Sequence, residues 1–492
     1  MQAIVRTLAV VSLAFLGAAV PVSAEIHELA FATLAQYRAF DTRSGAPVAR
    51  LADGSYAVVW NEAFQDARLQ WVRPDGSLAL ASGGLPLGKS FNSSPPVVAA
   101  HPVAGAFVAL AAQVEHGSRI LVQSFDGNAS PRWQTGGVAA LDSPGIEYQT
   151  APQLLASADG GVFVCFLRAA TTASSAATVC QRLDADGRPL WPGGRVAEAK
   201  PGFRSDTPIL ISDGKGGILV FWSTPVRTST VIPQAGDGPT NPIYLKGQRF
   251  GPDGSPLWGP AGKVLHLTSW WEPVFDFIRP LAVPDGQGGA ILAFPDWREQ
   301  AHPPLVLGVM AQRVDRNGKP LWGPGVTLER STNYPKLDSL TAHPNGGAVV
   351  VLQEAQGNSR FRLVLFRLGP GGKPRQPANG VVLSVPDRIQ QDYGSQGSFD
   401  GGRLRILWTS QGIFNAFTAQ VRIAVFEPDG RRLTAPGAAP LMPGDAQGGH
   451  FFAGFAFDAA RNQGMAIWND YSIPDFLTGP AGALFGGDAG VP

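Results

Sequence analysis

One segment recurs along most of this chain, and the repetition restricts the possible fold more than any other feature. Its copies read QWVRPDGSLAL, VQSFDGNASPRW, VCQRLDADGRPLW, KGQRFGPDGSPLWG, MAQRVDRNGKPLWG, LFRLGPGGKPR, AVFEPDGRRL and GALFGGDAG. A second segment alternates with it, in copies such as LADGSYAVVW, DGKGGILVFW and DGQGGAILAF. Because each unit recurs about every 58 residues, the chain is built from one repeated supersecondary unit and not from unrelated domains.

Each unit has the pattern of four β-strands. A short run of small apolar residues such as 152–157 precedes a Gly turn and a β-branched and aromatic run such as 161–167. The QR segment follows, and an Asp-Gly or Asn-Gly turn, a strong hairpin signal, separates it from PLW. Four strands in about 58 residues fit a β-propeller blade, whereas a solenoid would need shorter coils. We therefore predict an all-β fold: one eight-bladed β-propeller of four-stranded antiparallel blades, with seven blades as the alternative.

The two chain ends are predicted to meet. The last unit stops after three strands, and the apolar segment 26–33 has no repeat of its own. We expect this N-terminal strand to supply the missing outer strand and close the ring, which would hide unpaired backbone edges.

Recurrent aromatic residues are expected to hold the blades together. The tryptophans of PLW should dock the outer strand on the next unit, and the aromatic that closes the second strand should pack between blades. The first set is Trp191, Trp258 and Trp322, and the second is Trp60, Phe166, Trp222, Phe294, Trp408 and Trp468.

The D-x-x-G-x-x-x-W pattern, as in Asp184, Gly187 and Trp191, resembles the tryptophan-docking repeats of quinoprotein-like propellers. It is also similar to a repeat of secreted bacterial proteins. The resemblance covers nearly the whole chain after residue 24, but it specifies blades and not chemistry. The adjacent cysteine pair of quinone-cofactor dehydrogenases is absent, so we expect no quinone and no other cofactor.

The first 24 residues have the pattern of a signal peptide. Arg6 precedes an apolar run, and Val22, Ser23 and Ala24 provide small residues before a cleavage point. We therefore assign residues 1–24 to a signal peptide and 25–492 to the propeller domain. No later stretch is long and apolar enough to span a bilayer. We expect a secreted or periplasmic protein.

The chain has only two cysteines, Cys165 and Cys180. They lie on consecutive apolar runs, so a hairpin would bring them to disulfide distance. The alternative is two small buried residues that merely lie close together.

Charge and motifs exclude several classes of function. With 39 Lys+Arg against 38 Asp+Glu the net charge is +1, so no nucleic-acid partner is indicated. The seven His show no metal-ligand spacing, and His101 and His343, each before a Pro at a turn, look structural. The DGxGG loops at Asp213 and Asp285 lack the alternating acids of a calcium loop and are better interpreted as tight turns. We predict no metal site.

Variable loops at one end of the strands are the expected place for a binding site. Acidic residues follow several second strands, and two tryptophans next to a carboxylate lie between two units, as would suit a sugar ring. Alternatively, each acid pairs within its own loop and the tryptophans only cover the blade. The candidate residues are Glu62, Trp270, Trp271, Glu272, Asp296, Trp297, Arg298 and Asp470.

Two functions remain open. The first is a monomeric binding or scaffold module with no chemistry of its own, which engages a protein or a glycan through its loop-rich face. The alternative is a carbohydrate-active enzyme, hydrolase or lyase, that uses carboxylates at the axial mouth.

Overall fold

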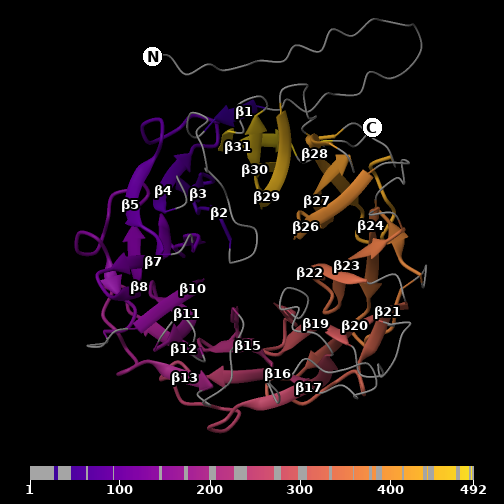
Figure 1. Cartoon of the computed structure of the whole chain (residues 1–492), viewed down its shortest axis with the longest axis horizontal. Coiled ribbons are helices and arrows are strands. Elements are labelled where there is room, and N and C mark those ends of the chain that lie inside the picture. The colour runs from indigo at the N-terminus through magenta and orange to yellow at the C-terminus, as the bar shows by residue number, and fades with distance from the viewer. Residues whose placement is uncertain are drawn as a thin grey trace, which may run out of the picture.

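In this computed structural model the described residues form a ring of β-sheets (Figure 1). No helix is among the described elements, so none there could cross a membrane. The structure describes residues 27–30, 46–62, 65–91, 94–142, 147–170, 176–198, 207–225, 241–270, 279–296, 307–331, 335–357, 360–375, 379–383, 390–412, 415–435, 440–441, 448–472, 477–486 and 489.

Four sheets have four strands each, all antiparallel. The first contains β2 (Val48–Arg50), β3 (Tyr56–Glu62), β4 (Asp66–Val72) and β5 (Leu85–Lys89). The second contains β14 (Ile209–Ser212), β15 (Ile218–Pro225), β16 (Asn241–Phe250) and β17 (Lys263–Trp270). The third contains β18 (Leu281–Pro284), β19 (Ala290–Asp296), β20 (Leu307–Val314) and β21 (Val326–Ser331). The fourth has the order β1 (His27–Ala30), β31 (Leu477–Gly486), β30 (Gln463–Ser472) and β29 (Gly448–Asp458).

Two further sheets are larger, with eight and seven strands. The eight-stranded sheet contains β6 (Val97–Ala100), β7 (Ala106–Val114), β8 (Gly117–Phe125), β9 (Val138–Ala139), β10 (Glu147–Ala156), β11 (Val162–Ala169), β12 (Ala177–Leu183) and β13 (Arg195–Glu198). The seven-stranded sheet contains β22 (Lys336–Ala342), β23 (Ala348–Ala355), β24 (Phe361–Leu368), β25 (Val381–Val382), β26 (Gln390–Asp400), β27 (Arg403–Gly412) and β28 (Asn415–Phe426).

The prediction of eight separate four-stranded blades, or alternatively seven, is wrong. Among the described residues only four sheets are separate four-stranded blades, and the remaining strands belong to the two larger sheets. The joins are parallel pairings, of β8 with β10 and of β24 with β26. Both occur where the outer strand, β9 or β25, is only two residues long. A short outer strand leaves backbone groups of its neighbour unpaired, and the start of the next inner strand pairs with them instead.

The two chain ends share one sheet. Strand β1 pairs antiparallel with β31, from His27 opposite Leu484 to Ala30 opposite Ala481. The N-terminal strand is therefore the outer strand of the sheet formed by the last three strands.

Apolar runs in the second strands are buried because both faces of each sheet are covered by neighbours. Strand β23 reads AVVVLQEA and is buried up to its last residue. Alternate side chains point to opposite faces: Val350 packs in one cluster with Ile291 of β19, and Val351 in another with Trp408 of β27. The core thus consists of layers between sheets.

The tryptophans of PLW connect successive units. Trp191, Trp258 and Trp322 each donate from Nε1 to a turn carbonyl of the next unit, at Pro252, Arg316 and Pro370, over 2.9–3.1 Å. Each indole lies on the turn glycine of that unit. At Gly254, whose φ is +83°, an added Cβ would lie 3.0 Å from Trp191 Cδ1. The repeated glycine is therefore required both by the turn and by the docked indole.

The QR segment explains the rest of the repeat. The Gln248 side-chain oxygen accepts from the Arg249 and Trp258 backbone amides, and its amide donates to the Gly259 carbonyl. Gln181 and Gln312 make equivalent contacts. This buried side chain fixes the outer segment against the third strand, which positions the tryptophan for docking.

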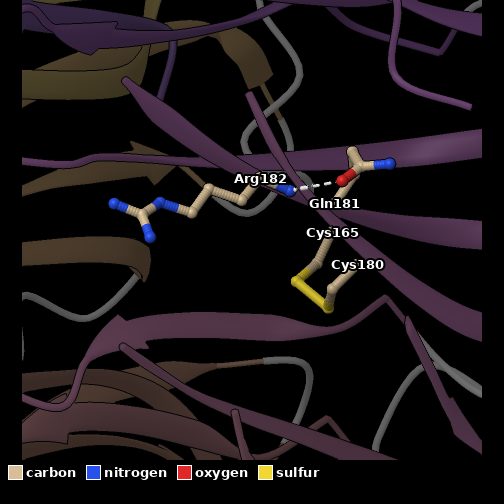
Figure 2. The surroundings of a disulfide bond; sticks show 4 residues. All are labelled: Cys165, Cys180, Gln181 and Arg182. Atoms are coloured by element: carbon tan, nitrogen blue, oxygen red, sulfur yellow. Dashed lines mark hydrogen bonds between the residues drawn. A yellow bond between two sulfur atoms is a disulfide. The ribbon is translucent and has the colours of Figure 1, made fainter. Parts of the chain in front are cut away.

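Cys165 and Cys180 form a disulfide within the β11–β12 hairpin. They lie directly opposite each other in the register, with their Cα atoms 4.1 Å apart, and both are fully buried. Figure 2 shows the bond beside Gln181, whose side-chain oxygen accepts from the Arg182 amide at 2.9 Å. Both cysteines belong to the same buried cluster as the docked Trp191.

Candidate functional site

The strands have two different ends. At the tight-turn end, short turns such as 213–217 and 251–255 connect the strands; the longer connections leave from the loop-bearing end. The predicted site residues that the structure describes belong to the second end. Trp271, Glu272, Trp297 and Arg298 lie outside the described residues, and Trp270 and Asp470 are described only as backbone positions in β17 and β30.

The acidic residue that ends a second strand is paired with an arginine in two units. Glu62 at the end of β3 contacts Arg68 of β4, with Oε2 2.8 Å from Nε. Glu354 in β23 accepts from Nε and Nη2 of Arg362, directly opposite in β24, at 3.0 and 2.8 Å. Both pairs are partly exposed. They brace the ends of their own hairpins.

Asp296 has a different partner. Its Oδ1 lies 3.1 Å from Nε2 of His266, on β17 of the preceding sheet. Both side chains are buried, and the imidazole packs on Phe294 with ring centroids 4.5 Å apart. This pair connects two sheets. Glu62 and Asp296 thus lie in different sheets, and their described contacts do not bring them together.

A second polar group, which we call the inner-strand cluster, consists of Asp338, Ser339 and Ser395, and Asp392 lies three residues before Ser395 on the same strand. It lies where β22 and β26, two strands nearest the centre of the ring in Figure 1, begin at the loop-bearing end. The Asp338 carboxylate accepts from the backbone amides of Gly394 and Ser395 at 3.1 and 2.6 Å. The two serine hydroxyls lie 2.7 Å apart. Asp392 accepts from Trp408 Nε1 at 3.3 Å.

Local backbone irregularities place this cluster. The register of β22 shifts at Asp338, and that of β26 shifts between Tyr393 and Gln396. A bulge turns a side chain away from the regular alternation and frees amide groups for other acceptors. Here the free amides of one inner strand meet the carboxylate of the preceding one.

Asp338 differs electrostatically from other aspartates of the structure. Burial raises the pKa of Asp338, and the hydrogen bonds from Ser395 and Gly394, which favour the charged form, do not offset it. Hydrogen bonds instead lower the pKa of Asp75 and Asp253 in their turns. Asp338 is only partly enclosed as a residue. A carboxyl group of this kind can hold a proton at a higher pH than an ordinary aspartate.

No group of three His, Cys, Asp or Glu side chains that could hold a metal ion occurs within the described ranges. Asp213 and Asp285 accept backbone amides of their own turns with one oxygen and pair with Arg249 and Arg313 through the other. Both carboxylates are therefore engaged within the fold.

Sequence reasoning did not select Asp338, Asp392 or His266. The available signal was a departure from the repeat: where β22 has Asp338 at its register shift, the shifts of β10 and β29 have Ala151 and Ala453. The partner of Asp296 had no sequence signal, because His266 belongs to another unit.

Of the comparisons with known proteins, only the one with solved structures finds similar proteins. No protein-family model matches the chain, and no curated protein matches it. The structure is similar to polysaccharide lyase Uly1, at 11% identity and a TM-score of 0.47, over 79% of this chain and 88% of that one. It is also similar to the α-L-arabinanase of Penicillium chrysogenum complexed with arabinobiose, at 13% identity and a TM-score of 0.38, over 69% and 94%.

A third similar structure is puromycin hydrolase, at 15% identity and a TM-score of 0.40, over 87% of this chain and 51% of that one. The chain thus spans about half the length of that protein. No functional conclusion rests on similarities this distant.

Proposed function

We propose that this propeller is a carbohydrate-active enzyme, a hydrolase or a lyase, whose reacting groups lie at the loop-bearing end of the innermost strands. The observation that carries the proposal is Asp338: a carboxyl group on an inner strand, with a pKa raised by burial and both oxygens bonded to backbone amides of the next inner strand. Cleavage of a glycosidic bond needs such a group, because the leaving oxygen must receive a proton.

We assign one step of the reaction to each member of this region. Protonated Asp338 donates a proton to the leaving glycosidic oxygen. We assign the second carboxyl group that glycoside hydrolysis requires to Asp392 of the neighbouring inner strand, which is buried and accepts from Trp408 Nε1. Gly394 and Ser395 hold the Asp338 carboxylate in place once its proton has left, since charged acceptors form the stronger hydrogen bonds.

The test is turnover of a panel of neutral and acidic polysaccharides by the protein and by Asp338→Asn. Reducing ends report hydrolysis, and ultraviolet absorbance of unsaturated sugars reports a lyase. We expect Asp338→Asn to lower turnover by about 100-fold or more, the usual contribution of a general acid. Asp75→Asn, on an exposed turn at the opposite end, is the matched control and should keep full activity. Undiminished turnover by folded Asp338→Asn would disprove the assignment.

A binding module without chemistry is the second candidate. It is favoured by the pairing of Glu62 with Arg68 and of Asp296 with His266, since carboxylates held in this way support loops rather than react. Binding of a glycan or a protein with no product from any polysaccharide would select this function.

We also propose that the protein acts in the periplasm or outside the cell. The support is the signal-peptide pattern of residues 1–24, which lie outside the described residues, together with the Cys165–Cys180 disulfide. Disulfides persist in oxidising compartments. Fractionation of cells that express the full chain tests this, and a cytoplasmic, unprocessed product would contradict it.

A further inference from the structure

The units differ in charge at the first residue of the turn that connects their first and second strands. In two units a turn aspartate neutralises the arginine of the third strand. Asp213 is 2.9 Å from Arg249 Nε, and Asp285 is 3.0 Å from Arg313 Nε, with all four side chains largely buried. Each arginine also donates to a turn carbonyl of the following unit. The positive charge is thus balanced within the fold.

The unit that begins with β22 lacks this balance. The turn position of the aspartate is taken by His343, whose amide bonds to the Gly347 carbonyl as that of Asp213 does to Gly217. Arg367 replaces Arg249 and donates to the Asp429 and Pro428 carbonyls at 2.6 and 2.8 Å. Within the described part of the chain Arg367 has no carboxylate ion pair. The negative charge of Asp429 raises the pKa of Arg367 by less than the positive charge of Arg375 lowers it.

A second arginine increases the excess of positive charge. Arg375 donates its amide to the Arg367 carbonyl, in the position that Leu257 and Leu321 occupy in the other two units. Its side chain is exposed. Burial and then the nearby Arg375 charge lower the pKa of Arg367. This unit therefore has one carboxylate fewer and one guanidinium more than the two units that contain Asp213 and Asp285.

His343 takes the position of the aspartate without a negative charge. Its Nδ1 accepts from the Asn345 amide at 3.1 Å, so the ring proton is assigned to Nε2. Nε2 is buried beside the Pro428 carbonyl, which also accepts from Arg367. The residue is 8% exposed and its ring packs against Phe399. Burial and the charges of Arg367 and Arg375 lower the pKa of His343.

We propose that His343, Arg367 and Arg375 form a binding site for an oxyanion, a phosphate or sulfate group, which takes the place of the missing aspartate. Guanidinium groups bind such tetrahedral anions through paired charge-assisted hydrogen bonds, and His343 leaves the position without the carboxylate that would repel them. The site lies at the tight-turn end and is independent of the proposed enzymatic function.

The test is isothermal titration calorimetry with inorganic sulfate, inorganic phosphate and galactose 6-sulfate, at constant ionic strength against chloride. We expect the wild-type protein to bind these oxyanions and Arg375→Leu to bind at least about tenfold more weakly, a loss on the scale of one charged hydrogen bond. Tighter binding of the sugar ester than of free sulfate assigns the site to glycan-borne groups, and equal binding assigns it to the free ion.

Two further variants keep the proposal falsifiable. His343→Asp restores the carboxylate of the other units and should abolish anion binding. Lys319→Ala removes an exposed cation from the equivalent turn of another unit and should leave it unchanged. The proposal is overturned if the wild-type protein binds no oxyanion in preference to chloride. Wild-type affinity in both Arg375→Leu and His343→Asp would overturn it equally.

Discussion

The two ends of the strands are held together by different kinds of contact. At the tight-turn end, the same buried contacts recur from unit to unit: an indole on a turn glycine, a glutamine on three backbone groups, and an arginine on an aspartate. At the loop-bearing end, the contacts are individual. Glu62 pairs with Arg68, Asp296 with His266, and Asp338 with a neighbouring backbone.

This difference indicates that the tight-turn end of each unit mainly stabilises the fold, while the loop-bearing end is free to carry functional residues. Contacts that recur between several successive units hold those units together, so a change there should destabilise the ring. Contacts that occur once leave each unit free to carry its own chemistry, which is where functional residues of rigid scaffolds usually lie. The comparison predicts large losses of stability at one end and small ones at the other.

The largest expected effect is at a docked tryptophan. Trp258→Ala removes a buried indole and its hydrogen bond to the Arg316 carbonyl, so the free energy of unfolding should fall by about 4 kcal/mol. Chemical denaturation measures it. Trp258→Phe keeps most of the packing and should cost distinctly less. A loss below about 1 kcal/mol for the alanine variant would show that the repeat tryptophan does not hold the seam.

A smaller effect is expected where the first and last sheets meet, because there an aspartate paired with two arginines connects the sheets. Asp458 is fully buried and pairs with Arg50 at 2.9 Å and Arg461 at 2.8 Å, which also donates to the Asp53 carbonyl. Both arginines are partly exposed, so Asp458→Asn should cost about 2 kcal/mol, less than loss of a fully enclosed pair.

The same seam gives a dependence on pH. Burial alone would raise the pKa of Asp458, but the hydrogen bonds from Arg461 and Arg50 outweigh it, and the pKa is lowered. Its contribution to stability is therefore complete above the unfolded value of about 3.9 and is lost as the pH falls from there through the lower folded value. Denaturation curves at several acidic pH values should show this loss of stability in the wild type. In Asp458→Asn the free energy of unfolding should fall less over the same pH range, because the asparagine does not titrate.

The smallest effect is expected at the loop-bearing end. Glu62→Gln removes a partly exposed pair with Arg68, and such pairs contribute at most about 1 kcal/mol. A loss of stability as large as that of Asp458→Asn, measured by the same denaturation, would contradict the claim that the tight-turn end contributes more to stability than the loop-bearing end.

The class of fold could be predicted from the sequence because the repeat encodes it directly. Turn glycines, the glutamine–arginine pair and the tryptophan occur at fixed spacings, and each has a local partner or the same partner in the next unit. An all-β propeller arrangement follows from such periodic contacts.

The number and size of the sheets could not be predicted. Whether two units fuse depends on how many residues of the outer strand pair with its neighbour. The QR and PLW pattern does not encode that length, and β9 and β25 pair over only two residues.

The candidate site was even less accessible to sequence reasoning. The acids after the second strands, such as Glu62, were visible, but their arginine partners were not. Asp338 gains its properties from a bulge and from amides some 56 residues away in the next inner strand. Contacts between units at irregular positions leave no spacing pattern.

The most direct test compares Asp338→Asn with Trp258→Ala, measuring the free energy of unfolding and polysaccharide turnover per folded molecule for both. The asparagine side chain keeps one of its two backbone hydrogen bonds, so a loss of about 1 kcal/mol in stability is expected, with turnover almost abolished. The tryptophan variant should lose far more stability and keep turnover in its folded fraction. Equal losses of stability, with turnover retained by Asp338→Asn, would contradict the division between an end that holds the ring and an end that acts.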